Sequence, residues 1–200
     1  MIESVLKDGY AYLPNCLRGG VCGTLLLKFS LAMFQYFPAK YRNDDTLDEI
    51  YRGKFGYYSF LNLETHRLFS ISVAINSALN LDPDVAYWHW EENRLRAYHI
   101  SEGGRLLAAK NNCSTYRYYA FIGVSATGRD FADGNFYIND HFNKGKTLRQ
   151  DPDHRKYFNL DQGDVLVIDG DRYIAGTEQV APGTHGRARE ICVLRAMEKT

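Results

Sequence analysis

The sequence predicts an α+β fold in which helices of the first third buttress one side of a β-barrel or jelly roll. Apolar residues recur at a helical period before residue 84 and at every second position after it. The later apolar runs are short and separated by turn signals such as Glu102-Gly-Gly104, a spacing typical of barrels. We therefore expect a single domain over residues 1–200, with 1–84 as mainly helical support and 85–200 as the barrel core.

The first third is expected to hold three helices and one strand. Met1–Lys7 is a candidate short helix, and Gly9–Pro14 is a candidate strand ended by proline. Apolar residues recur at helical spacing over Cys16–Phe37, and a further helical stripe follows Thr65, which can cap it. The segment 39–57 between them is polar and punctuated by glycine, so we expect a loop there.

Six strands are expected after residue 84, each rich in β-branched and aromatic residues. They are Val85–Trp90, Leu95–Ile100, Tyr116–Ser125, Asn135–Asn139, Val165–Asp169 and Glu190–Ala196. The charged run Asp151–Lys156 is expected to be a solvated loop. The aromatic segment Tyr57–Phe60 suits a dimer surface as well as a core, so a homodimer stays open.

Composition excludes several kinds of partner. Lys plus Arg and Asp plus Glu number 24 each, so the chain lacks the basic excess that nucleic acids or anionic membranes attract. Leu25–Phe37 is the longest apolar stretch and is too short to span a bilayer, and no secretory signal is visible. Cysteines without CxxC spacing indicate buried thiols in a reducing compartment: Cys16, Cys22, Cys113 and Cys192. We expect a soluble cytoplasmic protein with a small-molecule ligand.

The C-terminal part carries the most specific pattern. It runs Gly163-Asp-Val-Leu-Val-Ile-Asp-Gly170, then Arg172-Tyr-Ile-Ala175, Val180–Gly183, and Arg187-Ala-Arg189 at the start of an apolar strand. This order resembles the closing strands of the Fe(II)/2-oxoglutarate-dependent dioxygenases, in particular the prolyl-hydroxylase-like members. The resemblance implies a double-stranded β-helix, which is a jelly-roll or cupin-like barrel.

The chemistry of that family needs two histidines and one carboxylate on one face of an iron ion. The resemblance places the ligands at Ala108 with Lys110 or Ala109 with Asn111, and at Ile174 or Ala175. None of these sets can hold Fe(II), because hydrocarbon side chains do not ligate and an ammonium repels a cation. The sequence therefore predicts a dioxygenase-like fold that lacks the usual iron site and needs no cofactor.

Two arginines are the main candidates for ligand binding. In the family that the chain resembles, an arginine at the start of the last core strand pairs with the distal carboxylate of 2-oxoglutarate. Arg187 and Arg189 stand at that position, and pairing with an acidic residue at the barrel end is the structural alternative. Asn111 and Tyr137 are further candidates for substrate contacts.

Lys110 is the candidate catalytic base, since burial would favour its neutral and nucleophilic form. Tyr118 and His99 are its candidate acid–base partners. A substitute metal site would draw on side chains in or beside the predicted strands, namely His89, Glu91, His99 and His141. Fe(II) and 2-oxoglutarate would be the cofactors in that case alone.

Three functions stay open at this point. The first choice is a metal-independent, non-oxidative biosynthetic step on a small carboxylate-bearing molecule, such as a cyclisation, isomerisation or elimination. The second is a divergent Fe(II)/2-oxoglutarate oxygenase with a rebuilt metal site that hydroxylates a small molecule. The third is a non-catalytic protein that binds a ligand or a partner. A fold does not choose between them.

Overall fold

The computed structural model describes residues 7–17, 20–23, 55–60, 71, 74–75, 77–78, 95–100, 102–106, 117–140, 154–186 and 188–196. Within these residues the chain forms eleven strands in three sheets. All strand pairs are antiparallel, which is typical of jelly rolls and related barrels.

The largest sheet has six strands in the order β1-β8-β4-β11-β3-β2. Their bounds are β1 Tyr10–Leu13, β2 Phe55–Phe60, β3 Leu95–Ile100, β4 Tyr118–Gly123, β8 Val165–Asp169 and β11 Arg189–Ala196. The order interleaves early and late parts of the chain, so β11 lies between β4 and β3 in the middle of the sheet.

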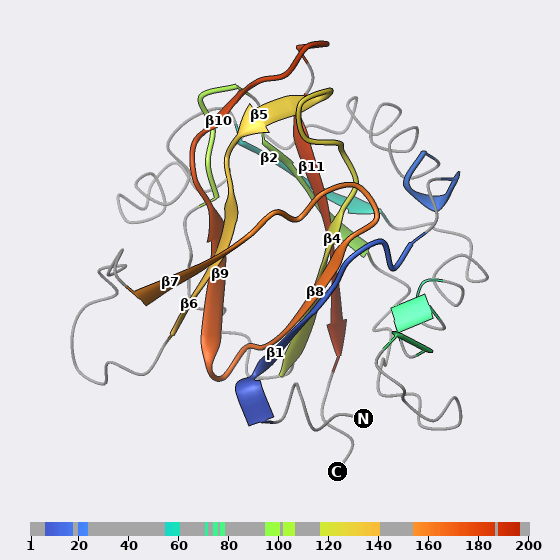
Figure 1. The fold of residues 1–200 in the computed structure, drawn as a ribbon, viewed down its shortest axis with the longest axis vertical. Helices are drawn as coiled ribbons and strands as arrows, with labels where there is room; N and C mark the ends of the chain where they lie inside the picture. The colour runs from blue at the N-terminus through green and yellow to red at the C-terminus, as the bar shows by residue number, and fades with distance from the viewer. Residues whose placement is uncertain are drawn as a thin grey trace.

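A three-stranded sheet faces the large one, in the order β7-β6-β9. It consists of β6 Phe136–Asp140, β7 Arg155–Phe158 and β9 Tyr173–Thr177, while β5 Phe131–Asp133 pairs separately with β10 Val180–Pro182. Residues 103–106 run beside β9 and β10, since Gly103 N donates to Val180 O at 2.8 Å and Thr177 N donates to Leu106 O at 2.7 Å. Figure 1 shows the two sheets face to face, with β5 and β10 across one end.

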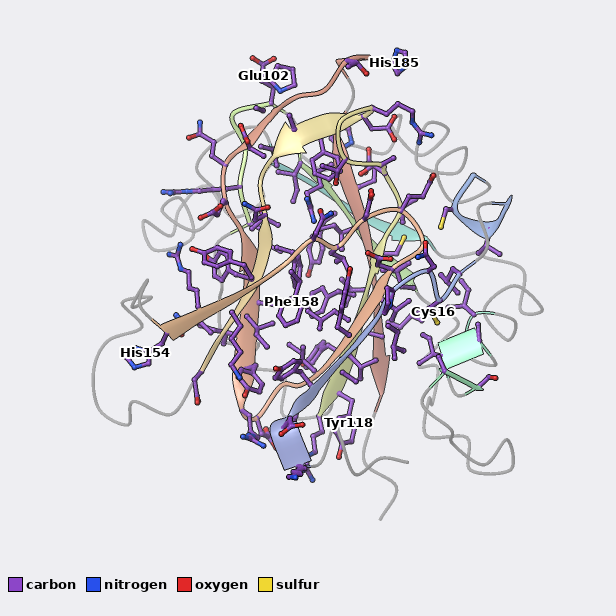
Figure 2. The ribbon with its side chains drawn as sticks, in the orientation of Figure 1. Cys16, Glu102, Tyr118, His154, Phe158 and His185 are labelled. Atoms are coloured by element: carbon purple, nitrogen blue, oxygen red, sulfur yellow. The ribbon has the colours of Figure 1, made fainter. Side chains whose placement is uncertain are left out.

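Side-chain alternation along the strands divides the core into two parts. The inward face of the large sheet meets the small sheet in the barrel interior, which is lined by aliphatic and aromatic side chains (Figure 2). The inward residues include Ile100, Tyr119, Phe121, Leu166, Ile168, Ile191 and Val193 from the large sheet, and Phe136, Ile138 and Tyr173 from the small one.

The outward face of the large sheet carries the second part of the core. Its residues include Tyr118, Ala120, Ile122, Val165, Val167, Cys192 and Leu194. Leu17, Cys22, Ile71 and Ile75 cover this face, and residues 20–23, 71 and 74–75 are helical. The sequence places Ile71 and Ile75 on one helical stripe, and both are buried here. In the described residues Cys22 and Cys192 are buried free thiols.

The expected strands Leu95–Ile100 and Val165–Asp169 match β3 and β8 residue for residue. Two expectations of loop structure are wrong. Residues 55–57 begin β2, because tertiary pairing with β3 outweighs a local glycine signal. The charged run ending at Lys156 enters β7, because an edge strand tolerates polar side chains that project into solvent. The expected strand Val85–Trp90 and nearly all of Met1–Lys7 lie outside the described residues.

The two sheets approach each other at β1 and β7, and rings rather than backbone hydrogen bonds join them there. The Phe158 ring centroid lies 5.5 Å from that of Tyr10 and 5.6 Å from that of Tyr12. The Tyr12 hydroxyl donates to Asn159 O at 2.8 Å. Among the described strands, β1 pairs with β8 alone and β7 pairs with β6 alone.

Candidate functional site

Arg189 is a cation inside the barrel. It opens β11 opposite Ile100, and alternation puts its side chain on the inward face with Ile191 and Val193. The residue is only 2% exposed, and no carboxylate forms an ion pair with it among the described residues. A buried charge without a paired counter-charge costs free energy. Arg189 is therefore the residue of this interior whose presence needs a functional explanation.

Two groups hold the Arg189 guanidinium in place. Its Nη2 donates to Leu160 O at 3.2 Å, and its Cζ lies 4.4 Å from the centroid of the Phe131 ring. Burial lowers the pKa of Arg189 to about 10, while the more distant charge of Asp161 acts in the opposite direction. The side chain is therefore still a cation at neutral pH. Its Nε is buried without an acceptor, which leaves a donor available to a ligand.

The backbone that carries the Leu160 carbonyl is fixed by close packing against β4. Gly163 N donates to Gly123 O at 2.9 Å, and Gly123 N donates to Asp164 O at 3.0 Å. A Cβ on Gly123 would lie 2.1 Å from Asp161 O and 2.8 Å from Leu160 O. Glycine is therefore required at position 123, because any side chain there would collide with the backbone of residues 160–161. In its observed position this backbone offers the Leu160 carbonyl that orients Arg189.

His99 and Glu190 form a polar pair on the opposite face of the same strands. They are direct cross-strand partners in β3 and β11, and His99 Nδ1 contacts Glu190 Oε1. Glu190 is 7% exposed, and its Oε2 is buried without a hydrogen-bond partner. Burial raises the pKa of Glu190, which the bond to His99 partly offsets. Because Glu190 and Arg189 alternate along β11, this pair points away from the barrel interior.

We expect Glu190 to make stability depend on pH. Its pKa is raised in the folded state, so above the ordinary carboxyl range the unfolded chain binds fewer protons than the folded chain. Stability should therefore fall as pH rises from that range toward the raised value. Glu190→Gln should remove this fall, and urea denaturation at a series of pH values measures it. Glu102→Gln, at an exposed turn, is the matched control, and an unchanged slope in Glu190→Gln contradicts the assignment.

Of the candidate catalytic residues the structure describes Tyr118 and His99, and it does not bring these two together. Tyr118 lies on the outward face of the large sheet, as His99 does. Tyr118 pairs with Asp169 and lies beside the end of β11, whereas His99 lies beside its start, so the two side chains are at opposite ends of the sheet. Figure 2 shows Tyr118 at the end of the molecule opposite Glu102. Tyr137 is 1% exposed and packs with Ile174 on the outward face of the small sheet. Of the described candidates, Arg189 alone faces the interior, and the roles of the others stay predictions.

The remaining candidates lie outside the described residues: Lys110, Asn111, Arg187, His89, Glu91 and His141. Within the described part of the chain, no three His, Cys, Asp or Glu side chains cluster as metal ligands. The third ligand position implied by the resemblance lies in β9, where Ala175 pairs with Ile138 and Ile174 faces outward. Neither side chain can donate an electron pair to a metal, so these residues do not fit an iron centre.

Sequence reasoning missed the groups that surround the two charged residues. Phe131 and the Leu160 carbonyl position Arg189, and Glu190 pairs with His99. The signal Asp161-Gln-Gly163 predicts a turn, but nothing in it indicates which side chain the turn approaches. Cross-strand neighbours become visible only when the strand order is known, because the register fixes which residues face each other.

This architecture defines the class of fold: the chain is a double-stranded β-helix of the kind found in Fe(II)/2-oxoglutarate oxygenases, as the sequence resemblance implies. A prolyl-4-hydroxylase from Pseudomonas putida superimposes with a TM-score of 0.63 at 9% identity, covering 99% of this chain and 97% of that one. A prolyl hydroxylase from Trichoplax adhaerens gives 0.64 at 10% identity, covering 98% and 86%. A 2OG-Fe(II) oxygenase family protein from Burkholderia pseudomallei gives 0.58 at 11% identity, covering 97% and 88%.

These likenesses concern the fold. No family model matches the sequence, and no curated protein matches it significantly. In the part of the chain that is described, no helix has the length and apolar character that crossing a bilayer demands.

Proposed function

We propose that the barrel interior binds a small carboxylate-bearing molecule through Arg189. The observation that carries the proposal is the buried guanidinium, which has a free Nε donor and no carboxylate partner among the described residues. A carboxylate is the natural ligand of a guanidinium fork, because two parallel hydrogen bonds match its geometry. Phe131 on one face of the fork orients its donors toward such a ligand.

The proposed reaction on that molecule is a metal-independent, non-oxidative step. Hydrocarbon side chains at Ile174 and Ala175 support it, because they supply no third ligand for the iron that oxidative chemistry in this fold uses. The experiment is isothermal titration of 2-oxoglutarate and of succinate into the protein, each in EDTA and again with anaerobic Fe(II). Binding in EDTA supports the proposal. Binding that requires Fe(II), followed by formation of succinate and CO2 from 2-oxoglutarate once O2 is admitted, would establish an oxygenase instead.

Arg189→Met should weaken carboxylate binding at least a hundredfold, because one charged bidentate partner of this kind contributes about 3 kcal/mol. The same variant should unfold at an equal or higher temperature, since it removes an uncompensated buried charge. Titration and thermal denaturation measure the two effects. Arg105→Met, at an exposed position, should change neither. Unchanged affinity in Arg189→Met overturns the assignment of the site.

A further inference from the structure

Strand β7 is an edge strand of the small sheet as far as the described residues go. It pairs with β6 on one side, and no other described strand pairs with it. Lys156 and Tyr157 in its middle are exposed, and Tyr157, at 49%, is the one exposed large hydrophobic residue of the described part. An open strand edge offers unpaired N–H and C=O groups that a second extended chain can pair with.

Positive charge gathers at this edge. The described strands of the small sheet carry two cations, Arg155 and Lys156, and one carboxylate, Asp140. No described carboxylate forms an ion pair with the Lys156 ammonium, which lies instead 4.8 Å from the centroid of the Tyr10 ring. Because the whole chain has a net charge of zero, this excess of positive charge is local to the β7 edge.

Aromatic rings hold these groups in place before any partner arrives. Arg155 Cζ lies 4.3 Å from the centroid of the Tyr137 ring, and the Tyr157 ring centroid lies 6.1 Å from that of Tyr137. Tyrosine and arginine are enriched among the residues that dominate binding energy at interfaces, and side chains already ordered lose less entropy on binding.

We propose that β7 binds an extended acidic segment of a partner protein, which joins the small sheet as its next strand. Backbone pairing supplies affinity, Tyr157 supplies an apolar anchor, and Lys156 selects for carboxylates. A second copy of this chain is disfavoured at the same edge, because β7 against β7 would place like charges opposite each other. The edge lysine likewise discourages pairing with neutral strands.

The test uses a fluorescently labelled peptide of sequence Glu-Val-Glu-Thr-Glu-Val-Glu-Thr and fluorescence anisotropy with the full chain. Binding should be saturable and should weaken about tenfold in Lys156→Glu and in Tyr157→Ala, because a charge reversal and a lost anchor each cost about 1.4 kcal/mol. Both residues are exposed, so both variants should fold. Arg105→Glu makes the same charge reversal outside this sheet and should change affinity less than twofold.

Three results would overturn the proposal. The first is equal binding of a peptide with lysine in place of glutamate, and the second is equal weakening by Arg105→Glu. The third is unchanged hydrogen exchange of the amides of residues 156–158 when the acidic peptide is bound. A concentration-dependent dimer that Lys156→Glu abolishes would assign the edge to a second copy instead.

Discussion

Replacing Gly123 with alanine is expected to lower the free energy of unfolding by about 3 kcal/mol or more. The new methyl carbon would lie 2.1 Å from Asp161 O and 2.8 Å from Leu160 O, and both are backbone atoms that cannot rotate away. Gly123 is also paired through its own N–H and C=O to the same turn, so the turn cannot withdraw without losing these hydrogen bonds. Urea denaturation measures the loss.

The same substitution should weaken carboxylate binding, because the displaced Leu160 carbonyl is the acceptor that orients Arg189. Gly23→Ala is the matched control. Gly23 is helical and exposed, and a Cβ there meets nothing within 4 Å, so alanine should stabilise by up to about 1 kcal/mol. Wild-type stability in Gly123→Ala would mean that the turn can move and that it does not fix the position of Arg189.

Replacing Asp164 with alanine is expected to cost about 2 kcal/mol, because Asn15 N loses its acceptor, while the Tyr12 hydroxyl and Asp161 N each lose one acceptor and keep Asn159 O. Asp164 is 5% exposed and lies 2.5 Å from the Tyr12 hydroxyl, 2.8 Å from Asn15 N and 3.1 Å from Asp161 N. It thereby fastens β1 to the turn before β8. Burial raises the pKa of Tyr12, and the bond to Asp164 raises it further, so the phenol is a neutral donor.

A double-mutant cycle separates these contributions. Tyr12→Phe removes one donor and should cost about 1 kcal/mol, and its effect should be smaller in the Asp164→Ala background. Asp171→Ala changes a carboxylate whose side chain is 78% exposed and should alter stability by less than about 0.5 kcal/mol. Additive effects of Tyr12→Phe and Asp164→Ala would show that the two side chains act separately.

The barrel could be predicted from the sequence because alternation and turn residues are local signals. Leu95–Ile100 and Val165–Asp169 carry both signals and match their strands residue for residue. β7 could not be predicted, because its charged residues look like a loop until a neighbouring strand supplies its hydrogen bonds. β2 could not be predicted for a related reason, because its pairing with β3 forms only in the assembled sheet.

The site could be predicted only in part. The sequence predicts Arg189 as a ligand-binding residue at the start of the last strand; the structure shows that its side chain is buried, and its role stays a prediction. The groups that contact the Arg189 guanidinium could not be predicted. Leu160 acts through its backbone carbonyl and Phe131 through the face of its ring, and no sequence pattern indicates either contact. His99 points away from the interior because side chains alternate along β3 and β11 and His99 pairs with Glu190, the neighbour of Arg189. This could not be predicted without knowing the register of the two strands.

The central place of β11 has a consequence for how the protein is made. On the ribosome, β1, β4 and β8 emerge as one half of the large sheet, and β2 and β3 emerge as another. Nothing in the sheet order joins these halves until residues 189–196 are synthesised, because β11 is the strand between them. Until then each half exposes an unpaired edge and apolar side chains, the condition in which nascent chains recruit chaperones. Closure of the large sheet is therefore a late event that follows synthesis of its last strand.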